Sequence, residues 1–128
     1  MTAPRDNGVS IHAAKPRRRD RDDAPSDVRR RALLYSHDTF GLGHLRRART
    51  IASALTERDP GLAALILTGS PIAGRFDFPD RVDHVRLPGV VKLADGDYAS
   101  HNLGISIEDT VDLRASIIAA TDSAFAPG

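Results

Sequence analysis

The feature that most constrains the fold of this chain is residues 35–47, which read YSHDTFGLGHLRR. A short apolar run precedes this stretch, two glycines interrupt it, and a histidine and two arginines open the pattern that follows. We interpret it as the end of a buried strand, a glycine-rich turn and the first turn of a helix. Backbone N–H groups and the positive end of a helix dipole meet at such a turn, which therefore suits a phosphate or a sugar hydroxyl.

The sequence on both sides of this stretch predicts alternating strands and helices. Residues 31–36 form the continuous apolar run that is typical of a parallel strand covered on both faces. A helical pattern over 45–55 ends at 59–61, where Asp, Pro and Gly follow one another. Further strands are expected near 62–67 and 82–87. A strand, a helix and a strand within about forty residues require a right-handed parallel crossover.

The helical spacing also predicts which side chains face the core. For the first helix these are Leu45, Ala48, Ile51, Ala52 and Leu55. A polar, glycine-containing loop is expected over 92–104, and Ser106 then caps a last helix, with Asp109 three residues later. The expected core-facing side chains of that helix are Ile107, Val111, Ile118 and Phe125.

The predicted fold class is α/β, a partial Rossmann-like three-layer domain with a parallel sheet. Residues 1–30 combine Pro, Arg, Asp and Ser with few large apolar side chains, so we expect a disordered basic tail there. Residues 31–128 are expected to form one domain. The sequence ends where the α/β pattern calls for another strand, and we therefore expect a truncated domain whose thin sheet has an open edge.

The charge is unevenly distributed and argues against nucleic acid as a partner. Residues 1–31 hold nine Lys and Arg against five Asp and Glu, whereas the rest of the chain holds nine against twelve. The net charge of +1 therefore combines a basic tail with a mildly acidic body. An acidic body gives no electrostatic reason to expect binding to nucleic acid.

Composition also limits the chemistry and the compartment. The chain has no cysteine, which excludes disulfides and thiolate metal sites, and its histidines are too scattered to predict any metal site. The basic residues near the N-terminus are followed by no signal-peptide core, and the longest apolar run, 62–67, is too short to span a bilayer. We expect a cytoplasmic protein.

Two nucleotide-binding motifs fit the glycine-rich stretch poorly. Gly41 and Gly43 match the first two glycines of the dinucleotide fingerprint, but Arg46 stands where the third small residue is needed. The second strand ends in Thr68 and Gly69, without the carboxylate that binds a ribose hydroxyl. The Gly-Lys-Ser/Thr signature of nucleoside triphosphatases is absent. We therefore predict no cofactor.

A different family fits better. Residues 36–48, SHDTFGLGHLRRA, and the helix pattern of 45–55 resemble the N-terminal domain of GT-B type glycosyltransferases, specifically predicted transferases similar to the peptidoglycan lipid-linked N-acetylglucosaminyltransferase. The resemblance covers about residues 31–128 and is specific mainly in the first loop. It implies an acceptor-binding portion of an inverting transferase that moves a hexosyl group from a sugar nucleotide. The donor site would lie in a second domain, so we expect this chain alone to be inactive.

The resemblance also implies roles for individual residues. His44 is the candidate catalytic base, because inverting transfer requires a group that takes the proton of the acceptor hydroxyl. Gly41 and Gly43 would let the acceptor or its lipid diphosphate approach the backbone. The remaining candidates for acceptor or phosphate binding are Arg46, Arg47, Asp38 and His37.

Two other functions stay open from the sequence. The chain could be a stand-alone module that binds a phosphate or lipid diphosphate and works with a partner subunit, or a nonfunctional gene fragment. The acceptor could be a sugar, a polysaccharide or a lipid-linked sugar, and a lipid-linked acceptor would bring peripheral contact with a membrane.

Overall fold

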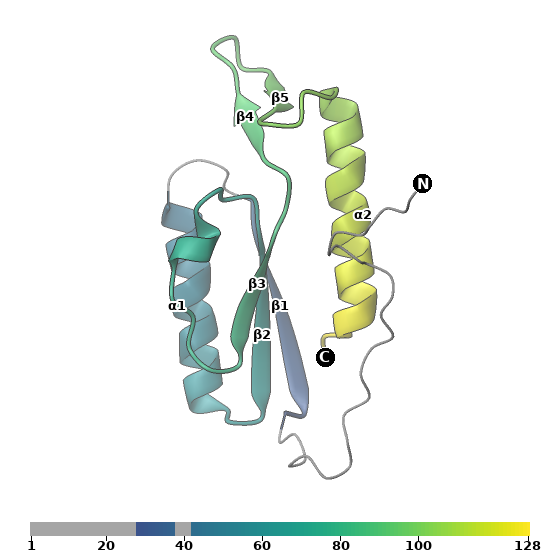
Figure 1. Cartoon of the computed structure of the whole chain (residues 1–128). Coiled ribbons are helices and arrows are strands. Elements are labelled where there is room, and N and C mark those ends of the chain that lie inside the picture. The colour runs from purple at the N-terminus through teal and green to yellow at the C-terminus, as the bar shows by residue number, and fades with distance from the viewer. Residues whose placement is uncertain (1–27, 38–41) are drawn as a thin grey trace, which may run out of the picture.

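The computed structural model of the chain describes residues 28–37 and 42–128 as an α/β structure with a three-stranded parallel sheet, a small two-stranded sheet and two long helices (Figure 1). The elements in chain order are β1 (Arg30–Ser36), α1 (Gly43–Arg58), β2 (Leu62–Thr68), the short 3-10 helix η1 (Ala73–Arg75), β3 (Val82–Arg86), β4 (Val90–Lys92), β5 (Tyr98–Ser100) and α2 (Ile107–Phe125). The α/β class, the three parallel strands and both helices expected from the sequence are confirmed.

The parallel sheet brings the carboxyl ends of its three strands to one edge. The strand order is β1-β2-β3, with β2 in the centre. The register places Ser36 of β1 beside Thr68 of β2, and Thr68 beside Arg86 of β3. Ligands of open α/β sheets bind outside this carboxyl edge. The glycine-rich stretch of the sequence leaves β1 at this edge.

The two helices lie on opposite faces of the sheet (Figure 1). Side chains alternate across a strand, so successive residues of β2 serve different helices. Ala64 and Ile66 belong to the core cluster that includes Leu45 of α1, whereas Leu65 lines a groove with Phe125 of α2. Leu45 and Ile66 are both fully buried. The main core of the described residues therefore lies between the sheet and α1.

The face of α1 that is buried differs at one edge from the face predicted by the helical spacing. Leu45, Ala48 and Ala52 are buried as expected, but Ile51 is 44% exposed and Leu55 is 38% exposed. Thr56 is buried instead, and its hydroxyl is satisfied within the helix by the carbonyls of Ala52 at 3.0 Å and Ser53 at 3.1 Å. Apolar character alone predicted the wrong residues at the edge of the buried face, since a threonine whose hydroxyl bonds to its own helix can also be buried.

Helix α2 begins as predicted but buries different side chains. The amide of Asp109 donates to the Ser106 hydroxyl at 3.0 Å, which confirms the N-cap. Val111 is 50% exposed, so its predicted place in the core is wrong. The buried residues of α2 are Thr110 and Arg114, which lie on the adjacent side of the helix.

The segment expected to be a loop over 92–104 contains a hairpin. Strands β4 and β5 pair antiparallel, with Lys92 opposite Tyr98, and project beyond the carboxyl edge of the parallel sheet (Figure 1). A tight turn connects them: the Leu93 amide donates to the Asp97 carbonyl at 2.6 Å, and Gly96 has a φ of +94°. The prediction of a polar, glycine-containing loop was wrong for Tyr98–Ser100, because a pairing this short has too few residues to show an alternating pattern.

The N-terminal boundary of the ordered region lies close to the predicted residue. Residues 1–27 of the predicted tail lie outside the described residues. Strand β1 begins at Arg30, whose side chain forms a 2.7 Å ion pair with Asp59 after α1. Within residues 28–37 and 42–128, no helix is long and apolar enough to cross a membrane.

Candidate functional site at the carboxyl edge of the sheet

Two of the predicted site residues lie close together at the end of β1. His37 directly follows β1 and His44 is the second residue of α1; both side chains are exposed. Their ring centroids are 5.8 Å apart, and the rings are tilted by 33°. Asp38 and Gly41, which the sequence also predicted for this site, lie outside the described residues. The structure thus pairs the candidate base with a second imidazole that sequence reasoning had placed only in a binding role.

Among the described residues, no side chain caps the N-terminus of α1. Leu42 is the N-cap residue, and the first turn contains no acidic side chain. The first intrahelical bond runs from the Arg46 amide to the Leu42 carbonyl at 2.8 Å. The amides of the preceding first-turn residues therefore have no partner within the helix, and they point along the axis toward the carboxyl edge of the sheet. An anion is favoured at such an end.

The other predicted residues of α1 are open to solvent. Arg46 and Arg47 are exposed, and neither side chain makes a hydrogen bond or an ion pair in the described part of the chain. Gly43 has no positive φ, and a Cβ atom built there would meet nothing within 4 Å. Packing in the described residues therefore does not require a glycine at this position, and the backbone of Gly43 is accessible to a ligand.

Sequence reasoning missed a buried hydroxyl at the same edge. Ser36 is 3% exposed, and its Oγ has no hydrogen-bond partner in the described residues. Its neighbour Thr68 is fully buried, but its Oγ1 accepts a 3.1 Å hydrogen bond from the Ser70 amide. A buried polar atom without a partner is uncommon and marks a place where a ligand or water is expected. The only signal in the sequence was a serine at the end of an apolar strand.

A second feature that the sequence did not reveal is the contact of β1 with α2. The Arg114 guanidinium donates from Nη2 to the Tyr35 hydroxyl at 2.9 Å and from Nη1 to the Pro88 carbonyl at 2.5 Å. Arg114 is 7% exposed, and the Tyr35 ring stacks on His37 with centroids 6.4 Å apart. This contact joins residues that are far apart in the sequence, so no local motif could predict it.

The site has the groups for proton transfer and anion binding. A neutral imidazole offers one donor and one acceptor, and arginine offers only donors. Among the described residues of this edge, His37 and His44 supply the imidazoles and Arg46 and Arg47 supply the guanidinium groups. No group of three or more His, Cys, Asp and Glu residues suitable for a metal ion occurs in the part of the chain that the structure describes.

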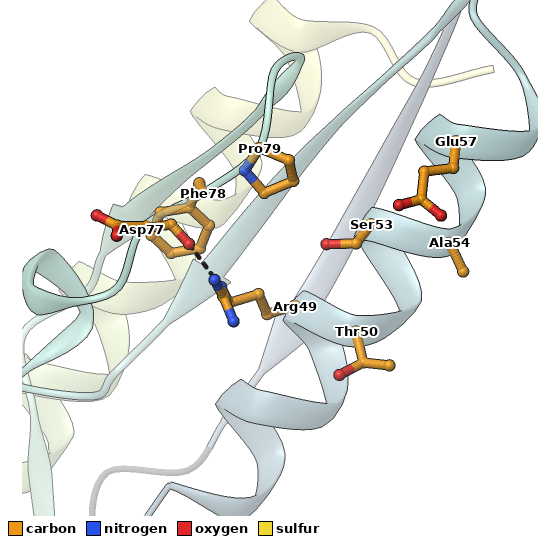
Figure 2. A pocket seen from close by; sticks show the side chains of 8 residues that line it. All are labelled: Arg49, Thr50, Ser53, Ala54, Glu57, Asp77, Phe78 and Pro79. Atoms are coloured by element: carbon orange, nitrogen blue, oxygen red, sulfur yellow. Dashed lines mark hydrogen bonds between the residues drawn. The ribbon is translucent and has the colours of Figure 1, made fainter.

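A separate groove of about 510 Å³ runs along the outer part of α1 (Figure 2). Its walls come from α1 and from the segment between η1 and β3; the residues are Arg49, Thr50, Ser53, Ala54, Glu57, Asp77, Phe78 and Pro79. Arg49 donates from Nε to the Asp77 carbonyl at 2.6 Å, and its guanidinium lies 5.7 Å from the centre of the Phe76 ring. None of the predicted site residues lines this groove, which has no histidine.

The chain was also compared with known proteins. It matches no family model, no curated protein and no solved structure. The functional interpretation therefore depends on the residues at the carboxyl edge and on the resemblance of residues 36–48.

Proposed function

We propose that this chain is the acceptor-binding portion of an inverting glycosyltransferase that uses a sugar nucleotide, and that its sheet is the N-terminal part of a Rossmann-like, GT-B type domain. The observation that supports this proposal is the pair His37 and His44 beside the N-terminus of α1, which no side chain of the described residues caps. Proton acceptors and free backbone amides meet there within one short segment. Glycosyl transfer to a phosphate-bearing acceptor needs both.

In the proposed reaction, His44 acts on the acceptor hydroxyl. It takes the hydroxyl proton as the oxygen forms a bond to the anomeric carbon of the donor sugar, while the bond from that carbon to the nucleoside diphosphate breaks. The leaving group departs on the opposite face, so the configuration inverts. His37, 5.8 Å from His44 between ring centroids, orients the acceptor by a hydrogen bond.

The first turn of α1 binds the acceptor in this proposal. The free amides of the turn and the side chains of Arg46 and Arg47 supply donors and positive charge for a phosphate or diphosphate group. Gly43 leaves room for that group next to the backbone. The sugar nucleotide binds in another portion of the transferase.

The same turn also supports the second candidate function, a module that binds a phosphate or lipid diphosphate and performs no transfer itself. The specific observation in its favour is that the first turn of α1 contains no acidic residue and is capped by no side chain of residues 28–37 or 42–128. The two functions differ in what the histidines do. A binding module needs the amides and arginines, whereas a transferase also needs His44 as a base.

The test is the variant His44→Ala, assayed for transfer of labelled hexose from a panel of sugar nucleotides in the assembly that contains the donor-binding portion. We expect the rate to fall by about a hundredfold or more, while binding of the acceptor to the chain is retained, because loss of a general base affects the reaction step. The matched control is His101→Ala, since His101 is an exposed histidine away from β1 and α1.

The outcomes separate the alternatives. Near-normal transfer by His44→Ala would exclude His44 as the base. Acceptor binding without transfer in the assembled protein would favour the binding module. Binding of a sugar nucleotide at residues 43–47, seen as shifts of their amide resonances, would overturn the assignment of this edge to the acceptor.

A further inference from the structure

Arg114 is a buried cation with no anionic partner in the described part of the chain. It is 7% exposed, and both of its hydrogen bonds go to neutral oxygens, the Pro88 carbonyl and the Tyr35 hydroxyl. The ion pairs found among the described residues involve Arg30 and His84, not Arg114. Burial of a charge is costly unless other groups compensate it. The positive charge of Arg114 is therefore poorly compensated, and it acts on the groups to which it is bonded.

The Tyr35 hydroxyl is bonded to this buried charge and belongs to a side chain that is itself exposed to solvent. Guanidinium has only donors, so the phenol oxygen accepts from Arg114 and its own proton stays available for another bond. No acceptor for that proton exists among the described residues, and Tyr35 is 51% exposed. Accepting a charge-assisted bond polarises the O–H group and makes it a stronger donor.

The position of Tyr35 gives this donor a role at the candidate site. Tyr35 is the second-last residue of β1, and its ring stacks on His37 with an interplanar angle of 20°. His37 in turn lies beside His44. The phenol and the two imidazoles thus form a continuous row of rings at the carboxyl end of β1. Each of the three side chains can donate a hydrogen bond.

We propose that the Tyr35 hydroxyl, polarised by Arg114, donates a hydrogen bond to a phosphate oxyanion bound at the carboxyl end of β1. Tyr35 contacts the ligand, and Arg114 is a positioning residue that acts through Tyr35. This inference deepens the proposed function, since it assigns the phosphate of the acceptor to a defined donor. A lipid-linked diphosphate and a free sugar phosphate offer the same oxyanion.

The test is a titration of the purified chain with inorganic phosphate and methyl phosphate, followed by the ring resonances of the histidines and by calorimetry. Tyr35→Phe removes only the hydroxyl, and we expect it to weaken phosphate binding about tenfold, the effect of losing one charge-assisted hydrogen bond. The matched control is Tyr98→Phe on β5, because the chain has two tyrosines and Tyr98 is 53% exposed. That variant should bind phosphate as the unaltered chain does.

A second variant examines the charge. Arg114→Gln removes the positive charge, and its shorter side chain also withdraws the donors from Tyr35 and Pro88, so we expect phosphate binding to weaken several-fold while the thermal unfolding transition stays cooperative. This variant keeps the inference testable if Tyr35→Phe fails to fold. Comparison of a short-chain prenyl diphosphate with a hexose 1-phosphate then distinguishes a lipid-linked source from a free one.

Three results would overturn the inference: no binding of either phosphate by the unaltered chain, equal binding by Tyr35→Phe, or an equal loss in Tyr98→Phe. These results are independent of glycosyl transfer. If Tyr35→Phe loses phosphate binding while no transfer is found in any assembly, the oxyanion site stands and the transferase proposal fails. If transfer occurs and Tyr35→Phe binds phosphate normally, the transferase proposal stands and the inference about Tyr35 fails.

Discussion

The two long helices cover opposite faces of the same sheet, yet they bury opposite kinds of side chains. Helix α1 buries Leu45 completely and packs it with Ile66 of β2. The buried residues of helix α2 are Thr110 and Arg114, and its apolar side chains Ile107, Ile117, Ile118 and Phe125 are only half-buried. The α1 face is thus sealed by apolar side chains, whereas the most buried side chains of α2 are polar.

The two kinds of contact make different contributions to the molecule. Apolar burial is non-directional and supplies most of the free energy of folding, so the α1 face stabilises the sheet. Hydrogen bonds contribute little net stability but fix the position of groups. On the α2 face, Arg31 donates from Nη1 to the Phe125 carbonyl at 2.9 Å, and Arg114 holds Tyr35 at the candidate site. The polar contacts of the α2 face therefore fix the position of Tyr35 beside His37 more than they stabilise the fold.

The strongest way to break the comparison is Ile66→Ala in the α1 core. Ile66 is fully buried, so its truncation should lower the free energy of unfolding by about 2–5 kcal/mol, measured by urea denaturation. The control is Val111→Ala on the exposed side of α2, where a change within about 0.5 kcal/mol is expected. Equal losses in the two variants would contradict the assignment of the main core to α1.

A smaller effect is expected from the cap of α2. Ser106→Ala removes the acceptor of the Asp109 amide and should lower the free energy of unfolding by about 1 kcal/mol, seen as a shift in the thermal midpoint. Ser116→Ala, an exposed position within α2, is the control and should not destabilise the chain. If Ser106→Ala had no effect on stability, the polar contacts of α2 would be weaker than we infer.

The smallest effect on stability, and the most informative for the site, is expected from Gly43→Ala. A methyl group meets nothing within 4 Å there, and alanine is the better helix former, so stability should rise by up to about 1 kcal/mol. Acceptor or phosphate binding should nevertheless weaken, because the methyl group occupies the space next to the free amides. Unchanged phosphate affinity in a titration would show that no ligand approaches this backbone.

The sequence predicted those features that depend on local pattern. The strands near 31–36 and 62–67 follow from continuous apolar runs, and the Ser106 cap follows from a residue type at a helix start. The sequence failed where a polar side chain is buried by satisfying its own bonds. In α1, Thr56 is buried whereas Leu55 is exposed. In α2, Arg114 is buried whereas Val111, which was expected in the core, is exposed.

For the candidate site, too, the sequence identified individual residues but not the contacts between them. The glycine-rich stretch identified His37 and His44 by their positions after a strand and at a helix start. Their ring contact could not be read from a spacing of seven residues, because the path of the intervening turn sets the distance. The burial of the Ser36 hydroxyl likewise depends on tertiary packing around the end of β1, which no local pattern of residues encodes.

By itself, the sequence determined the class of fold, the parallel crossover and the edge of the sheet at which a ligand is expected, because hydrophobic periodicity and turn residues act over short distances. Only the tertiary structure decided which side of each helix is buried and which groups meet at that edge. Arg114 and Tyr35 are 79 residues apart in the chain, and their 2.9 Å contact exists only because α2 returns across the sheet to β1. The course of α2 is determined by many weak packing contacts between residues that are far apart in the sequence.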